Sequence, residues 1–120
     1  MEEKKERRVF RRAPIEASAD IVESRMASIG RATIENIGVG GAFIRTDAEV
    51  KPGTVLSLLI HSDKLGGGIL ATARVIWVEP GKGVGVRFLE MESGDRLAIE
   101  RYVAERAGVE GRFLADKVSS

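Results

Sequence analysis

The sequence predicts an all-β core of about six short antiparallel strands, followed by one α-helix. Two observations lead to this fold class. Apolar and polar residues alternate with the period of a half-buried strand through most of residues 15–88, and clusters of glycine and proline separate the alternating stretches. After Met91 the apolar residues recur with the period of an amphipathic helix. This order of elements favours an antiparallel barrel or sandwich over a fold in which strands and helices alternate.

The first half of the chain contains a basic arm and three predicted strands. The arm ends at Pro14, which favours extended backbone in the residue before it, so the arm is expected to lead directly into a strand. Strands are expected at residues 15–23, 31–37 and 42–46. A turn rich in glycine joins the second of these strands to the third.

The second half contains three more predicted strands and the helix. Strands are expected at residues 54–61, 69–79 and 84–88, again with glycine-rich turns between them. Ser93 is a suitable N-cap for the helix, and Gly108 is expected to end it.

The length and composition describe one globular domain. A chain of 120 residues can bury a core without disulfides or a metal. We expect this core in residues 15–107, between a flexible basic arm of residues 1–14 and a tail of residues 108–120. No apolar run approaches the roughly 20 residues of a membrane-spanning helix, so no membrane insertion is expected. The lack of cysteine and the charged start, which lacks the apolar centre of a signal peptide, predict a cytoplasmic protein.

Positive charge is concentrated at the N-terminus. The formal net charge of the whole chain is only +1, which argues against a general nucleic-acid surface and against DNA or RNA as a partner. Residues 1–12, by contrast, carry six lysines and arginines against three glutamates. This local excess favours a small anionic ligand.

An enzyme is not predicted. The chain has a single histidine, His61, at the end of a predicted strand, and it has no cysteine. These residues are too few for a typical metal site, and no cofactor is expected. The glycine-rich phosphate-binding motifs of nucleotide-hydrolysing and dinucleotide-binding proteins are absent as well.

Two segments could form a ligand site. One is the glycine-rich segment of residues 35–43, because glycine lets a backbone approach a ligand closely. The other is the arginine cluster near the N-terminus, since guanidinium groups bind phosphates and guanine edges through paired hydrogen bonds. The cluster consists of Arg7, Arg8, Arg11 and Arg12. Each segment also has a simpler interpretation, the first as a hairpin turn and the second as a solvated run of charge.

The single tryptophan, Trp77, has two interpretations. Its position in the alternating pattern, in phase with Ala73 and Val75, predicts a place in the core. The alternative is an indole at the end of a strand that stacks on a purine base.

The order of these features resembles that of the PilZ domain family, the bacterial receptors for the second messenger cyclic di-GMP. The family motif R-x-x-x-R falls on residues 8–12, with its second arginine two residues before Pro14. The motif [D/N]-x-S-x-x-G falls on residues 36–41, and Gly-Val-Gly-Val-Arg-Phe at residues 83–88 and the terminal helix complete the likeness. The resemblance implies a six-stranded antiparallel barrel that binds a nucleotide without catalysis.

The resemblance also implies the residues of the binding site. These are Arg7, Arg8, Arg12, Asn36, Gly38 and Gly41, and Trp77 joins the predicted site through the stacking interpretation given above. Gly38 stands where the family motif has serine, so one hydroxyl is missing, and a neutral hydrogen bond contributes about 0.5 to 1.5 kcal/mol. Restoring serine at this position is therefore expected to tighten binding. A degenerate PilZ-like module that binds proteins but not the nucleotide is the alternative.

Arg7 increases the number of ligand molecules that are expected to bind to each chain. In the family that this chain resembles, an arginine immediately before the first motif accompanies binding of cyclic di-GMP as an intercalated dimer, so two ligands per chain are expected. Closure of the arm over the ligand would change the surface that is offered to a protein effector.

Overall fold

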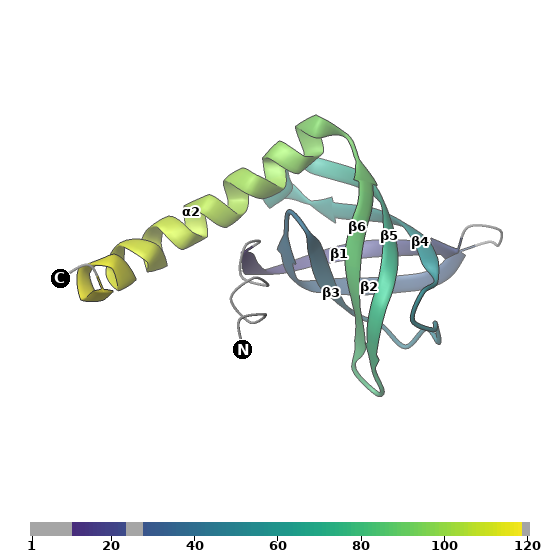
Figure 1. The fold of residues 1–120 in the computed structure, drawn as a ribbon. Coiled ribbons are helices and arrows are strands. Elements are labelled where there is room, and N and C mark those ends of the chain that lie inside the picture. Colours follow the sequence, from purple (N-terminus) through teal and green to yellow (C-terminus); the bar gives the residue numbers. More distant parts are fainter. Residues whose placement is uncertain (1–10, 24–27, 119–120) are drawn as a thin grey trace.

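The computed structural model describes residues 11–23 and 28–118, in which six strands form a closed antiparallel barrel (Figure 1). The order of the strands around the barrel is β1-β2-β3-β6-β5-β4. Their bounds are Arg12–Glu23 for β1, Ser28–Gly38 for β2, Gly41–Arg45 for β3, Val55–Ser62 for β4, Gly67–Glu79 for β5 and Gly83–Met91 for β6. The predicted six-stranded barrel is confirmed.

Alternation along the strands builds the core. On β4, for example, Leu56, Leu58 and Ile60 are buried, while Leu59 between them is exposed. The same alternation on the other strands directs one apolar face of each strand to the inside of the barrel. The fully buried large side chains are mostly isoleucine, leucine and valine. Because one face points outward on every strand, the outer surface is free to carry a site.

Strand β1 begins earlier than the sequence pattern predicts. It starts at Arg12, and Ala13 is already buried in the core, whereas the pattern places the first strand residue at Ile15. Pro14 is compatible with this position because the register of β1 against β2 shifts immediately after it. The last residues of the predicted arm therefore belong to the barrel wall, and Arg12 has a defined position on it.

The C-terminal helix α2 runs from Ser93 to Val118 and projects away from the barrel (Figure 1). Its first turns pack on the barrel through the buried side chains of Ile99, Tyr102 and Val103. The expected end at Gly108 is wrong, since the helix continues beyond this residue. A glycine inside a helix costs about 1 kcal/mol relative to alanine, and the helix continues through both Gly108 and Gly111.

A short 3-10 helix, η1, was not predicted. It spans Asp63–Leu65 between β4 and β5, and the Ser62 side chain caps it by accepting a hydrogen bond from the Lys64 backbone N–H. Leu65 is buried, and η1 contacts α2. The loop between β4 and β5 is thereby packed against α2.

Candidate functional site

The two motif segments meet on the outer surface of the barrel. Arg12 on β1 lies directly opposite Gly38 on β2, and its Nη1 donates a hydrogen bond of 3.2 Å to Oδ1 of Asn36. Gly38 ends β2 and Gly41 begins β3, so the turn between them lies next to the start of β1. Residues that are 24 positions apart in the sequence are thus brought together by the pairing of β1 with β2.

Arg12 is a surface cation next to the glycine turn. Its Nη2 lies 3.3 Å from the position that a Cβ would take on Gly41. Burial lowers the pKa of the Arg12 guanidinium because it removes water from the charged form, although an arginine stays protonated at neutral pH. Among the described residues its hydrogen-bond partner is the neutral amide of Asn36. Because this partner is neutral, the charge of Arg12 remains available to an anionic ligand.

Gly38 is required by close packing of the backbone. A Cβ at this position would lie 2.0 Å from the carbonyl oxygen of Arg11, a distance at which atoms overlap. The β1 backbone therefore occupies the space that a serine side chain would need. The expected gain in affinity from Gly38→Ser is replaced by an expected loss, because the new side chain would have to displace β1 and Arg12 with it.

Trp77 is not in the core. Its side chain is 42% exposed, and the prediction from the alternating pattern is wrong. The reason is a shift in register, since Val75 pairs with Val86 but Trp77 pairs with Gly85, which leaves Ile76 as an extra residue on β5. The bulge turns the indole to the outer surface.

The indole of Trp77 rests on Gly85 and beside Phe43. A Cβ on Gly85 would lie 2.1 Å from Cζ3 of the indole, so only glycine leaves room for the ring. The rings of Trp77 and Phe43 are stacked, with centroids 6.0 Å apart and an angle of 29° between their planes. Together, Trp77, Gly85 and Phe43 form an aromatic platform, in which Phe43 and Gly85 are buried and the indole of Trp77 is exposed.

Arg12, Asn36 and Gly41, here called the arginine site, share one outer surface with the aromatic platform. The strand register connects them as successive cross-strand neighbours in the order Pro14, Asn36, Phe43, Gly85 and Trp77. Sequence reasoning placed Asn36 and Trp77 in the site but not Phe43 and Gly85, which lie between them in this row. The one feature of the sequence that could have indicated Gly85 is its position as a glycine within the alternating pattern of residues 83–88.

Of the seven site residues expected from the sequence, five are described by the structure. Arg12, Asn36, Gly38 and Gly41 lie together, and Trp77 lies further around the same surface. Arg7 and Arg8 lie outside the described residues.

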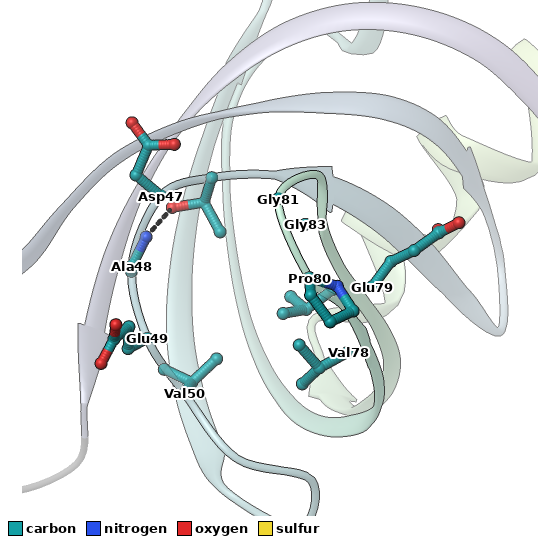
Figure 2. A pocket seen from close by; sticks show the side chains of 11 residues that line it. Asp47, Ala48, Glu49, Val50, Val78, Glu79, Pro80, Gly81 and Gly83 are labelled. Atoms are coloured by element: carbon teal, nitrogen blue, oxygen red, sulfur yellow. Dashed lines mark hydrogen bonds between the residues drawn. The ribbon is translucent and has the colours of Figure 1, made fainter.

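A pocket of about 320 Å³ lies elsewhere, between the loop after β3 and the β5–β6 hairpin (Figure 2). Figure 2 shows Val50 and Val78 in its interior, with the carboxylates of Asp47 and Glu49 pointing away from Val78. The loop is braced by a hydrogen bond of 3.0 Å from the Ala48 N–H to Oγ1 of Thr46. None of the site residues expected from the sequence lines this pocket.

The described part of the chain holds no cluster of three or more side chains suited to bind a metal ion. Within the same residues, no helix combines the length and the apolar character needed to cross a membrane.

Comparisons with known proteins agree with this geometry. The barrel is similar to the structure of the inhibitor of motility MotI/DgrA of Bacillus subtilis, with a TM-score of 0.68 and 23% identity over 83% of this chain, which spans 50% of the length of that chain. It is also similar to the PilZ domain of CeSA from a cellulose-synthesizing bacterium, with a TM-score of 0.58 and 20% identity over 82% of this chain and 97% of that one. No curated protein matches the sequence. The sequence model of the PilZ domain matches residues 6–105, and the chain therefore belongs to the PilZ domain family.

Proposed function

We propose that this chain is a cyclic di-GMP receptor that acts as an adapter without catalysis. The observation that carries the proposal is the contact between the two motif segments, in which Arg12 bonds Asn36 and reaches the position beside Gly41. Membership of the PilZ domain family, a family of cyclic di-GMP receptors, supports the same reading.

The chemistry of the ligand suits these groups. Each guanine of cyclic di-GMP presents O6 and N7 as neighbouring acceptors, which one arginine can bond with two parallel N–H groups. Arg8 and Arg12 act as the two arginines that clamp the ligand, with Asn36 orienting Arg12. The glycines at 38 and 41 let the neighbouring backbones pack closely, since a Cβ on either would overlap a carbonyl oxygen, and this close packing holds the turn beside Arg12.

Binding also acts as the switch. In this proposal the arm that carries Arg7 and Arg8 closes over the ligand, Arg7 holds a second molecule of an intercalated dimer, and Trp77 stacks on a base. The closed arm then presents a new surface to a protein effector. All these steps use binding energy alone and need no cofactor.

Calorimetric titration with cyclic di-GMP tests the proposal, with cyclic di-AMP and GTP as controls. We expect saturable binding of cyclic di-GMP and much weaker binding of the two controls, because recognition of guanine and of both phosphates is needed together. Absence of binding by the folded protein would instead favour the module that only binds proteins. The observation behind that second function is Gly38, which replaces the serine of the family motif.

A further inference from the structure

Two arginines face each other on the outer surface, and neither forms an ion pair with a carboxylate of the described residues. Arg74 on β5 lies directly opposite Arg87 on β6, and both side chains are exposed. Between described residues, Asp20 pairs with Arg31 and His61, and Glu35 pairs with Arg45. Neither Arg74 nor Arg87 takes part in any of these pairs. Like charges directly opposite on neighbouring strands destabilise a sheet. The pair therefore has a cost in the free protein that a bound anion would relieve.

The surroundings of the pair contain little negative charge. On β5 and β6 the positions that flank it on the outer surface are Thr72, Trp77, Gly85, Leu89 and Glu90, of which only Glu90 carries a negative charge. Glu90 is the next carboxylate along β6, but it lies opposite Thr72 and forms no ion pair with either arginine. The positive charge of the pair is thus not neutralised by the adjacent positions of these two strands.

The pair continues the arginine site around the barrel. Arg87 lies directly opposite Gly41, the residue next to which Nη2 of Arg12 is placed. Neighbouring strands are about 4.8 Å apart, so Gly41, Arg87 and Arg74 follow one another across roughly 10 Å of surface. The aromatic platform borders this row, since Gly85 and Arg87 point to the same side of β6.

We infer that Arg74 and Arg87 form a phosphate-binding pair that extends the nucleotide site from β3 onto β6 and β5. This inference rests on the proposed function, because it assigns the pair to a phosphodiester of the same ligand that Arg12 holds. Two guanidinium forks can bond different non-bridging oxygens of one phosphate, which relieves the repulsion between them. A base held near Arg12 and a phosphate at the pair would place the ligand along the edge of the aromatic platform.

The test compares Arg74→Met and Arg87→Met with Arg101→Met. Arg101 is exposed on α2, so its substitution makes the same change in net charge away from the site. Trp77 is the only tryptophan, and its fluorescence can report binding of cyclic di-GMP beside calorimetry. We expect about tenfold or greater weakening for each variant of the pair, and a change of less than twofold for Arg101→Met. Affinities within twofold of the unmodified protein for both variants of the pair would overturn the inference.

Arg12→Met separates this inference from the proposed function. If Arg12→Met abolishes binding but the two variants of the pair bind normally, the proposed function stands and the phosphate pair is refuted. If the unmodified protein does not bind cyclic di-GMP, the pair is tested with inorganic pyrophosphate at constant ionic strength. Pyrophosphate should then raise the melting temperature of the unmodified protein and of Arg101→Met more than that of Arg87→Met. An equal rise in all three proteins would refute the pair.

Discussion

At the scale of single residues, the proposed site depends most on Arg12. Arg12→Ala removes a charge-assisted contact to the ligand and should weaken binding of cyclic di-GMP by about 1.5 to 3 kcal/mol, measured by calorimetry. Arg8→Ala should have a similar effect. Both proteins should keep a cooperative melting transition, since Arg12 is exposed and Arg8 belongs to the polar N-terminal segment of the sequence. Arg101→Ala serves as the control, and affinity within twofold for either motif variant would contradict this placement of the motif.

Gly38 is the second residue on which the site depends. Gly38→Ser should destabilise the fold by about 1 to 3 kcal/mol in chemical denaturation, because its Cβ would overlap the Arg11 carbonyl oxygen, and it should weaken binding. Gly94→Ser is the matched control, since a Cβ on Gly94 would meet no atom within 4 Å. A Gly38→Ser protein with normal stability and tighter binding would show instead that the missing hydroxyl limits affinity.

At the scale of secondary-structure elements, the bulge in β5 decides where the indole of Trp77 lies. Gly85→Ala places a methyl group where the ring now rests, so the indole must move. We expect a shift in the tryptophan emission maximum and a loss of cyclic di-GMP affinity comparable to that of Trp77→Ala. Gly68→Ala on β5 is the control, because its Cβ would make only ordinary contacts at 3.9 Å. Unchanged emission and affinity for Gly85→Ala would show that the platform is not part of the site.

The helix α2 is connected to the strand that carries Arg12. The hydroxyl of Tyr102 donates a hydrogen bond of 2.6 Å to the carbonyl oxygen of Pro14 on β1. Tyr102→Phe keeps the buried ring but removes this bond, and it should cost about 0.5 to 1.5 kcal/mol in chemical denaturation. The guanidinium of Arg106, 5.1 Å from the ring centroid, can still face the phenylalanine. Unchanged stability would mean that water replaces the hydroxyl at Pro14.

At the scale of the whole molecule, the proposed complex contains two ligands per chain. The arginines of the arm and of the barrel wall are more numerous than one cyclic di-GMP requires, and the surplus can hold a second, stacked molecule. Titration at protein concentrations well above the dissociation constant should therefore reach equivalence at two ligands per chain. Arg7→Leu should lower this value to one and weaken binding. Equivalence at one ligand for the unmodified protein would leave Arg7 without a role in binding.

Much of the fold could be predicted because it depends on local pattern. Alternation of apolar and polar residues identified all six strands, and the change of period after Met91 located the helix. The ends of these elements could not be predicted as well from the sequence. Strand β1 starts at Arg12 because pairing with β2 begins there, and α2 passes Gly108 and Gly111 because a glycine costs a helix only about 1 kcal/mol.

The sequence by itself determined the barrel, the helix and the two motifs whose order indicates the PilZ domain family. Only the tertiary structure decided that Trp77 faces outward, that Gly38 lies against the backbone of Arg11, and that Arg74 faces Arg87. The physical reason is that alternation along one strand specifies the faces of that strand alone. Bulges, close backbone contacts and cross-strand neighbours depend on the register between two strands, which the pattern of one strand does not contain.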